Sequence, residues 1–379
     1  MANKVRYIGL MSGTSADGID LALVEFDTEQ SQQANGAKLI ASYYQAYDNA
    51  THQKITRLYN ASDNEIDRAG SLNIELAQLF AHAIEQFLQQ EKLSPTDITA
   101  IGCHGQTIRH RPTISQFAST PFTLQIGCLQ TLALLTGIRV VGDFRTKDIA
   151  LGGQGAPLVP AFHQAIFGST ENDVFIVNIG GIANITFLPK NSPENTIGFD
   201  TGPGNALMDY WFAQHQAGRF DMQGKWADSG NICQDLLHTL LDEPYFRQPA
   251  PKSTGREYFN AQWLAKFIGK NAIKPADVQA TLTALTAETI AQQINKLSTK
   301  SDVYLCGGGV ENNVLVSLLN HKLSKHQVMN TQSKNINSDS LEAMAFAWLA
   351  FAFDKNIFGN IPAVTGASKP AVLGISVNP

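Results

Sequence analysis

The sequence predicts an α/β protein of two lobes, each built around its own β-sheet. Three observations lead to this prediction. The chain has 379 residues, more than one compact hydrophobic core usually organises. Short apolar strands alternate with helical segments, which is typical of α/β sheets. A strand–glycine turn–strand pattern opens the chain at residues 7–23 and recurs at residues 174–188, which indicates an internal duplication.

The composition excludes several classes of protein. Hydrophobic residues make up 44% and charged residues 16% of the chain, a balance that is ordinary for a globular protein and too apolar for a disordered one. The net charge of −5 gives no reason to expect nucleic acid or an anionic membrane as a partner. No apolar run approaches the roughly 20 residues of a membrane span. The four scattered cysteines form no CxxC pair, and together with the lack of a signal peptide they predict a cytoplasmic protein.

The first hairpin contains the first candidate phosphate site. Alternating apolar residues predict strands on both sides of a polar turn at residues 12–18. Gly13 and Gly18 permit positive φ angles, so backbone N–H groups can converge on one anion. Asp20 lies on the outgoing strand, and we prefer it to Asp17 as the acid nearest a metal ion. A plain turn of turn-forming residues is the alternative, and the recurrence of the hairpin argues against it.

Polar residues follow short strands between the two hairpins. The pattern predicts a strand over 38–47, an amphipathic helix over 72–93, strands over 98–103, 122–126 and 138–141, and a helix over 129–136. In α/β sheets, ligands bind where such strands end. The polar and glycine residues that we place at these ends are His104, Gln106, Asp143, Arg145, Gly152, Gly153 and Gln154.

The second hairpin repeats the glycine turn at Gly180-Gly181, with Asn184 facing its tip. The next strand leads through Asp200 into a glycine turn at residues 202–205, where a helix begins. A helix N-terminus suits an anion, and Asp200 suits a metal-bound water. A helix N-cap is the competing interpretation of Asp200.

The last third of the chain contains a third glycine turn. A helix is predicted over 281–297 and a strand over 301–306, which leads into Gly307-Gly308-Gly309. Three glycines let the backbone lie flat against a ligand such as a purine ring. A final helix is predicted over 340–353, where Glu342 is either a ligand contact or part of a capping box.

Four motifs are absent, and each absence excludes a class. The chain has no G-x-x-x-x-G-K-[ST] and no G-x-G-x-x-G after the first strand, which argues against a P-loop enzyme and a dinucleotide-binding fold. It has no H-E-x-x-H and no G-x-S-x-G, so neither a zinc protease nor an α/β-hydrolase is indicated.

The two hairpins, the acid between them and the late glycine turn together resemble the actin/hexokinase/Hsp70 superfamily, whose fold is a duplicated ribonuclease H-like domain with a central ATP cleft. Within it, the chain is similar to the anhydro-N-acetylmuramic acid kinase family. The stretches that match occur in the family's order at residues 9–20, 102–107, 142–145, 150–160, 178–185, 198–205, 251–256, 306–309 and 342–348. Ala16 and Cys103 depart from the family pattern, and neither removes a charged group.

This resemblance implies two lobes and a reaction. Residues 1–168 would form the N-terminal lobe, with segment 350–379 packing back on it, and residues 169–349 the C-terminal lobe. The enzyme would use ATP and Mg²⁺ to hydrolyse the anhydro ring of 1,6-anhydro-N-acetylmuramic acid and phosphorylate O6. The products would be N-acetylmuramic acid 6-phosphate and ADP, in the recycling of cell-wall sugars. A homodimer is compatible with the resemblance.

The same resemblance implies the site residues. The predicted ATP contacts are Gly13, Thr14, Ser15, Ala16, Asp17, Gly18, Ile19, Asp20, Gly180, Gly181, Asn184, Gly202, Gly204, Asn205, Gly307, Gly308 and Gly309. Mg²⁺ is expected near Asp20 and Asp200. The predicted sugar contacts are His104, Gln106, Arg145, Gly152, Gly153, Gln154 and Glu342.

The chemistry of an anhydro sugar selects the kind of base. The sugar has no free 6-hydroxyl, because O6 is released only when its bond to C1 breaks. A base should therefore activate water for attack at C1 while O6 attacks phosphorus. We predict that Asp143 is this base, and a structural Asp143–Arg145 ion pair is the alternative. Two other functions stay open at this point: a kinase of a free hexosamine or acyl group, and a nucleotide-gated binding protein of the Hsp70 or actin type.

Overall fold

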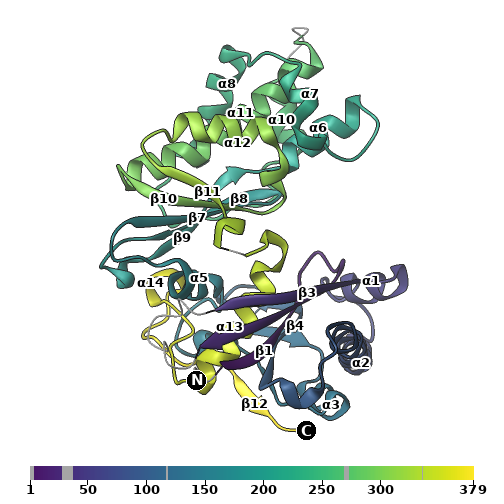
Figure 1. Cartoon of the computed structure of the whole chain (residues 1–379). Coiled ribbons are helices and arrows are strands. Elements are labelled where there is room, and N and C mark those ends of the chain that lie inside the picture. Colours follow the sequence, from purple (N-terminus) through teal and green to yellow (C-terminus); the bar gives the residue numbers. More distant parts are fainter. Residues whose placement is uncertain (1–3, 28–36, 117, 269–272, 335) are drawn as a thin grey trace. The chain divides into compact units, whose positions relative to one another are not determined.

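The computed structural model describes residues 4–27, 37–116, 118–268, 273–334 and 336–379, and it divides into two compact units. Unit 1 comprises residues 1–167 and 335–379, and unit 2 comprises residues 168–334. Each unit contains one mixed sheet covered by helices (Figure 1). Among the described residues, no helix has the length and apolar character that crossing a membrane requires.

The sheet of unit 1 has the strand order β12-β6-β4-β1-β2-β3, and β5 pairs with β4. Strands β1, β2 and β3 form an antiparallel meander, while β4 runs parallel to β1 and to β6. The strands of this sheet are β1 (Lys4–Ser12), β2 (Gly18–Asp27), β3 (Lys38–Ala46), β4 (Ala100–Arg111), β5 (Phe122–Ile126), β6 (Val140–Gly142) and β12 (Ile375–Val377).

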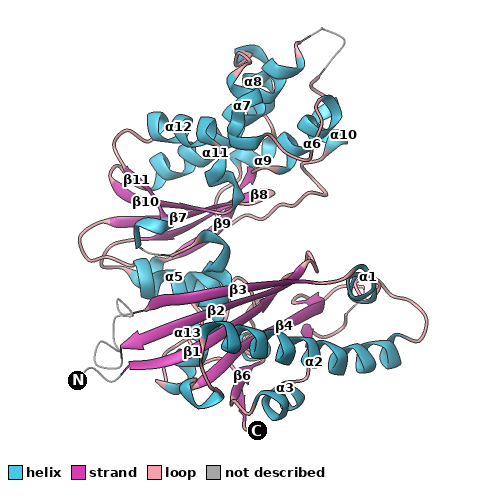
Figure 2. Ribbon diagram, turned by 45° about the vertical axis from the view of Figure 1, so that its right-hand side comes forward, coloured by secondary structure: helices cyan, strands magenta, loops and turns pink. Residues whose placement is uncertain are grey.

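Alternate residues of β1 face different helices, as the two-residue period of a strand requires. Ile8 and Leu10 are fully buried in the core that α2 forms with the sheet. Tyr7 faces the other side, where its ring packs edge-on against Phe351 of α13. Helices α2 and α3 therefore cover one face of the sheet and α13 the other (Figure 2). The helices of unit 1 are α1 (Asn49–Thr56), α2 (Glu65–Glu91), α3 (Leu129–Thr136), α4 (Thr146–Ala150), α5 (Val159–Phe167), α13 (Leu341–Asp354) and α14 (Pro362–Thr365).

Two glycines let α13 approach the sheet backbone to backbone. A Cβ atom on Gly9 of β1 would lie 1.7 Å from the carbonyl oxygen of Ala343, and one on Gly102 of β4 would lie 1.9 Å from that of Phe346. This contact assigns α13 to unit 1. The predicted lobe boundary at residues 349/350 is therefore wrong, because it would cut α13 in the middle. The boundary lies between Lys334 and residue 335.

Unit 2 repeats the strand arrangement of unit 1. Its sheet has the order β11-β10-β7-β8-β9. Strands β7, β8 and β9 form an antiparallel meander, β10 runs parallel to β7, and β11 runs parallel to β10. In unit 1, the strands β6-β4-β1-β2-β3 stand in the corresponding order and run in the corresponding directions. The strands of this sheet are β7 (Asp173–Ile179), β8 (Ile182–Leu188), β9 (Ile197–Pro203), β10 (Ser301–Cys306) and β11 (Gln327–Asn330).

Helices of unit 2 gather on one side of its sheet, with α11 buried along most of its length (Figure 1). Its apolar residues Leu282, Leu285 and Ile290 join the core with β7 and β8. The helices are α6 (Ala206–His215), α7 (Lys225–Asp228), α8 (Gln234–Leu241), α9 (Pro244–Arg247), α10 (Ala261–Ala265), α11 (Pro275–Leu297) and α12 (Asn313–Lys322). The α/β class and the internal duplication are thus both confirmed.

Several element boundaries differ from the sequence-based expectations. Strand β4 continues to Arg111, because β5 pairs with its second half and supplies hydrogen bonds beyond residue 103. His104 and Gln106 consequently lie inside a strand and not after one. Helix α2 begins at Glu65, earlier than expected. Its first turns are polar and carry no apolar stripe, so the hydrophobic pattern did not predict them. Helix α13 begins at Leu341, so Glu342 is its second residue and cannot complete a capping box, which needs the third.

Candidate functional site

The tip of the first hairpin is fixed through its carbonyl oxygens. The Gly13 oxygen accepts from Gln106 Nε2 at 3.0 Å, and the Thr14 oxygen accepts from the Tyr59 hydroxyl at 2.9 Å. The Ala16 oxygen lies 2.8 Å from Nδ1 of His52, which must donate to it. Since these carbonyl groups are occupied by the surrounding protein, the turn has a rigid shape. Rigid turns whose N–H groups point away from their support are the usual anion-binding nests.

Ala16 occupies an unusual backbone conformation in this turn. Its φ is +52°, a value that non-glycine residues seldom adopt, and its side chain is fully buried. Such residues persist only where the surroundings hold them, and they are concentrated at functional sites. The side chain of Ile19 is also fully buried, so any contact with a nucleotide would involve its backbone.

Gln106 supports the hairpin from behind. It is fully buried, and its Oε1 accepts from Ser12 Oγ at 2.6 Å. Its Nε2 donates to Gly13 and lies 3.2 Å from the hydroxyl oxygen of Tyr59. The protein therefore occupies both ends of this amide, and Gln106 lies behind the predicted phosphate turn.

The buried His104 pairs with the half-buried Arg145. The Nδ1 of His104 lies 2.7 Å from the Gly105 carbonyl oxygen and 3.1 Å from that of Ser12, so Nδ1 carries the proton. Its Nε2 then accepts from Arg145 Nη2 at 2.9 Å. Burial, aided by the nearby charge of Arg145, lowers the pKa of His104 to about 3. The imidazole is therefore neutral at physiological pH.

Arg145 keeps its charge without a carboxylate in direct contact among the residues that the structure describes. Its Nη1 donates to the Gly155 carbonyl oxygen at 2.7 Å, and its other donors meet His104. Burial lowers the pKa of Arg145 to about 10, and the charge of Glu342 opposes this decrease. The same environment raises the pKa of Glu342, against the lowering effect of Arg145. Glu342 is an exposed residue at the start of α13, and it is close enough to Arg145 for the two groups to influence one another's pKa.

Asp143 also has a strained backbone, with φ of +52°. Its Oδ1 accepts from Thr146 Oγ1 at 2.5 Å. Together with His104 and Gly105 it lines a pocket of about 270 Å³ at the end of β6. Within the described part of the chain, Asp143 and Arg145 form no ion pair, so the structural alternative for Asp143 is wrong.

The glycine loop at residues 151–155 encloses a carboxylate that the sequence-based prediction missed. Asp148 is fully buried, and its Oδ2 accepts from the Gly155 N–H at 2.7 Å. Gly153 is buried against this carboxylate, whereas Gly152 and Gln154 are exposed. The signal in the sequence was an acid followed closely by a G-G-x-G run, whose N–H groups can wrap an anion.

The second hairpin is supported by backbone groups. The Gly180 carbonyl oxygen accepts from the N–H of Asn205 at 2.7 Å. The Gly181 carbonyl oxygen accepts from the N–H groups of Gly204 at 2.9 Å and Ala206 at 3.1 Å. The predicted turn at residues 202–205 therefore packs directly on the predicted phosphate turn, and α6 begins at Ala206 as expected.

The late glycine turn lies against the same end of β7. Gly307 has φ of +81°, and a Cβ atom there would lie 2.3 Å from Asn178 Oδ1. A Cβ atom on Gly309 would lie 2.3 Å from Ile179 Cγ2. The Asn205 side chain donates to the Ile179 carbonyl oxygen at 3.0 Å. The three glycine turns of unit 2 thus form one cluster, as the predicted nucleotide contacts require.

Asp200 lies within β9 and is held by the loop at residues 252–254. Its Oδ2 accepts from Ser253 Oγ at 3.0 Å and from the Thr254 N–H at 2.9 Å. Burial raises the pKa of Asp200 despite these bonds. Because α6 begins six residues later at Ala206, the N-cap interpretation of Asp200 is wrong.

Arg256 is a cation that the predicted site residues do not include. A Cβ atom on Gly181 would lie 2.5 Å from its Nη2, so the guanidinium lies over the predicted phosphate turn. Its charge also reaches Asp209 of α6, whose pKa is raised to about 6 by burial and lowered in part by Arg256. A cation at this position suits a polyphosphate.

No group of three or more metal-ligating side chains occurs in the described ranges. Asp20 is half-buried in unit 1, and Asp200 is half-buried in unit 2. Mg²⁺ in kinases is usually held by one or two carboxylates together with phosphate oxygens and water. Single carboxylates therefore fit a magnesium ion that arrives with its nucleotide.

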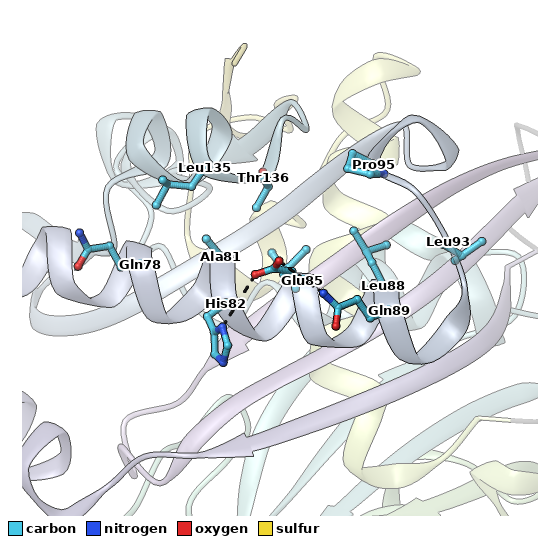
Figure 3. A pocket seen from close by; sticks show the side chains of 11 residues that line it. Gln78, Ala81, His82, Glu85, Leu88, Gln89, Leu93, Pro95, Leu135 and Thr136 are labelled. Atoms are coloured by element: carbon cyan, nitrogen blue, oxygen red, sulfur yellow. Dashed lines mark hydrogen bonds and ion pairs between the residues drawn. The ribbon is translucent and has the colours of Figure 1, made fainter.

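A second pocket lies away from all these residues. It has about 510 Å³ of space between α2 and α3 and the turn at Pro95 (Figure 3). In its lining, His82 Nδ1 lies 4.0 Å from Glu85 Oε2. None of the predicted site residues lines it, so its position does not suit the predicted chemistry.

Comparison with known proteins identifies the family. The family model of anhydro-N-acetylmuramic acid kinase matches residues 5–379. The chain belongs to this family. It is 54% identical to the anhydro-N-acetylmuramic acid kinase of Colwellia psychrerythraea, covering 98% of this chain and 97% of that one. The enzyme of the same name from Saccharophagus degradans is 50% identical, with 97% of each chain covered.

Solved structures show weaker likeness. The activator of 2-hydroxyisocaproyl-CoA dehydratase from Clostridium difficile aligns over 93% of this chain and 96% of its own, with a TM-score of 0.45 and 13% identity. A ROK family glucokinase from Streptomyces griseus aligns over 91% of this chain and 98% of its own, with a TM-score of 0.39 and 10% identity.

Proposed function

We propose that this chain is an ATP-dependent kinase of 1,6-anhydro-N-acetylmuramic acid. It opens the anhydro ring with water and phosphorylates O6, which yields N-acetylmuramic acid 6-phosphate and ADP in cell-wall recycling. The observation that carries this proposal is the family match along residues 5–379. It favours a kinase over a nucleotide-gated binding protein of the Hsp70 or actin type. We also propose that the enzyme acts in the cytoplasm.

We assign the sugar to the cluster of unit 1. Arg145 offers a charged guanidinium that neutral partners hold in place. His104 positions that guanidinium, and Glu342 provides an acceptor at the start of α13. The exposed Gly152 and Gln154 offer backbone and amide groups to the sugar. For Gln106 we now propose a supporting role behind the phosphate turn, since both ends of its amide are occupied.

We assign ATP to the glycine turns of both units. The backbone N–H groups at residues 13–18 and at Gly180-Gly181 would bind phosphate oxygens, joined by the guanidinium of Arg256. Residues 307–309 would contact adenosine. Asp20 and Asp200 would hold Mg²⁺ through water, and the ion would neutralise developing charge on the phosphates.

The reaction requires one base. It takes a proton from water, whose oxygen forms a bond to C1 as the C1–O6 bond breaks. O6 then forms its bond to the γ-phosphorus, and ADP leaves. Asp143 is our candidate, since Thr146 holds its Oδ1 in the pocket beside His104. Asp200 is a second candidate, because a raised pKa makes a carboxylate a stronger base near neutral pH.

Turnover with two sugars tests the function. The enzyme should consume ATP with 1,6-anhydro-N-acetylmuramic acid and far more slowly with free N-acetylmuramic acid. In ¹⁸O-labelled water the label should appear at the C1 hydroxyl and not in the phosphate ester. Equal turnover of both sugars would indicate a plain hexosamine kinase, and label in the ester oxygen would exclude the coupled ring opening.

Paired variants assign the base. Asp143→Asn should lower kcat by about 10²–10⁴ with ATP binding retained, the range for loss of a general base. Asp200→Asn is the matched variant. If Asp200 only helps to bind the metal, excess Mg²⁺ should restore much of its activity. A kcat loss in Asp200→Asn that Mg²⁺ does not restore, with near-normal Asp143→Asn turnover, would move the base to Asp200.

A further inference from the structure

Asp148 is a fully buried acid that the chemistry above does not use. Its Oδ1 accepts from Asn360 Nδ2 at 2.6 Å and from Thr365 Oγ1 at 2.8 Å. Its Oδ2 accepts from the Gly155 N–H at 2.7 Å. In these three contacts both carboxyl oxygens of Asp148 act as hydrogen-bond acceptors. Across the described ranges no cation pairs with it, although burying an uncompensated charge is costly. The burial of Asp148 without a cationic partner therefore needs a structural or functional explanation.

The loop at residues 151–155 is folded around this carboxylate. A Cβ atom on Gly153 would lie 2.3 Å from Asp148 Oδ2, so only glycine leaves room for the acid. The Gly153 N–H donates to the Asp148 carbonyl oxygen at 2.9 Å, and the Gln154 N–H donates to the Thr365 carbonyl oxygen at 2.7 Å. Asp148 thus joins the loop to the C-terminal segment of the chain.

Gly155 connects this carboxylate to the substrate cluster. Its N–H is bound by Asp148, and its carbonyl oxygen accepts from Arg145 Nη1 at 2.7 Å. Its φ of +65° is a left-handed backbone conformation that glycine adopts without strain. The other side of the guanidinium is held by His104 at 2.9 Å. Every contact in this series lies within unit 1.

The hydrogen-bond partners of Arg145 do not neutralise its positive charge. A carbonyl oxygen and a neutral imidazole fix the orientation of the guanidinium and add no negative charge next to it. A carboxylate in direct contact would hold it equally well, but would compete with an anionic or polar ligand. The carboxyl group in this hydrogen-bond network is that of Asp148, which reaches Arg145 only through Gly155.

We propose that Asp148 is a positioning residue for sugar binding. Through Gly155 it fixes the Arg145 guanidinium in one orientation while leaving its charge available to the sugar. This inference rests on the proposed function, in which Arg145 contacts the sugar. It adds to that function the residue that sets the geometry of the contact.

The first test separates sugar binding from stability. In Asp148→Asn one acceptor oxygen becomes an NH₂ group, which opposes the donors around it. We expect KM for 1,6-anhydro-N-acetylmuramic acid to rise about tenfold, equivalent to about 1.4 kcal/mol. KM for ATP should stay within about twofold, since the phosphate turns are not part of the network. Thr365→Val is the matched control, because it removes a donor to Oδ1 and leaves the Gly155 side intact. It should lower Tm without changing KM for the sugar.

A second variant changes Gly155 and leaves Asp148 unchanged. In Gly155→Ala, φ of +65° is strained and the new methyl lies 3.0 Å from Ile149 Cγ1, so the carbonyl oxygen that holds Arg145 shifts. KM for the sugar should again rise while KM for ATP stays constant. If Asp148→Asn and Thr365→Val lower Tm alike and neither alters KM for the sugar, Asp148 is only structural and the inference is overturned.

A measurement that does not depend on turnover tests the positioning role of Asp148 independently of the proposed function. The ¹⁵N chemical shift of His104 Nε2 reports the hydrogen bond that Arg145 donates to it. In Asp148→Asn this shift should move towards that of a nitrogen without a donor, and in Thr365→Val it should not. An unchanged shift in Asp148→Asn overturns the inference even if the wild-type enzyme is active. A changed shift in an enzyme that does not accept the anhydro sugar supports the positioning role and refutes the proposed substrate.

Discussion

The two hairpins lie on matching strands of two sheets with the same order, yet different chemical groups hold them. In unit 1, side chains of Gln106, Tyr59 and His52 bind the carbonyl oxygens of the turn. In unit 2, backbone N–H groups at residues 204–206 bind the corresponding oxygens. Both predicted phosphate turns are therefore held by hydrogen bonds to their carbonyl oxygens, but the shared fold does not dictate which groups donate those bonds. The two turns should consequently respond to different kinds of substitution.

The largest effect is expected from Gly204→Ala in unit 2. The added methyl would lie 2.3 Å from the Gly180 carbonyl oxygen and 3.1 Å from the Ala183 nitrogen, and both are backbone atoms that cannot move aside. We expect a loss of about 3 kcal/mol in the free energy of unfolding, at the upper end for overpacking. Urea denaturation of the ligand-free protein measures it.

Gly13→Ala is the matched variant in unit 1, where the added methyl meets only Ser15 Oγ at 3.5 Å. The free energy of unfolding should change by less than about 0.5 kcal/mol. Equal losses in the two variants would show that the hairpins are supported alike.

The next effect is expected from Gln106→Ala in unit 1. It removes one partner of the buried Ser12 hydroxyl and one partner of the Gly13 carbonyl oxygen. We expect a loss of about 2 kcal/mol, because buried polar groups would lose their bonds, and an increase in KM for ATP. Calorimetric unfolding and steady-state kinetics measure the two effects. Asn205→Ala in unit 2 removes one side-chain bond and leaves the backbone support, so its KM for ATP should change less.

Tyr59→Phe should have a smaller effect. It deletes the hydroxyl that donates to the Thr14 carbonyl oxygen and keeps the ring. A loss of about 1 kcal/mol is expected, the ordinary value for one hydrogen bond. ATP titration by calorimetry should show weaker binding by a small factor. Unchanged ATP affinity together with unchanged stability would mean that side-chain support of the first turn is dispensable.

The last comparison concerns opposite pH dependences of one residue in each unit, His104 and Asp209. The pKa of His104 is lowered to about 3, so its contribution to stability is complete above pH 6.5 and is lost as the pH falls towards 3. The pKa of Asp209 is raised to about 6, so its contribution is complete below pH 3.8 and is lost as the pH rises through 6.

Urea denaturation at pH 5 and pH 7.5 checks both signs. Relative to the wild type, His104→Gln should gain less stability between pH 5 and pH 7.5, because it lacks the imidazole that unfolding would protonate. Asp209→Asn should gain more, because it lacks the carboxyl that unfolding would ionise. Identical pH dependences in the three proteins would contradict both assignments.

Local patterns in the sequence determined the strands, the glycine turns and the duplication. Strand periods and glycine positions act within a few residues, so β7, β8 and β10 and the turns between them follow from short stretches. The clustering of residues 180–181, 202–205 and 307–309 was also predictable, since strand ends in a parallel arrangement meet at one edge. Membership of the kinase family followed from motifs along nearly the whole chain.

Only the tertiary structure decided how these pieces are supported. Strand β4 runs past Gly105 because β5 pairs with it, and α13 joins unit 1 because Gly9 and Gly102 admit its backbone. The position of Arg256 over Gly181 and the enclosure of Asp148 by residues 360 and 365 join parts of the chain that lie far apart. A short stretch of sequence specifies its own hydrogen bonds and periodicity. It does not specify the distant partner that will bury a charge or pair with a strand edge, because that partner is set by packing of the whole unit.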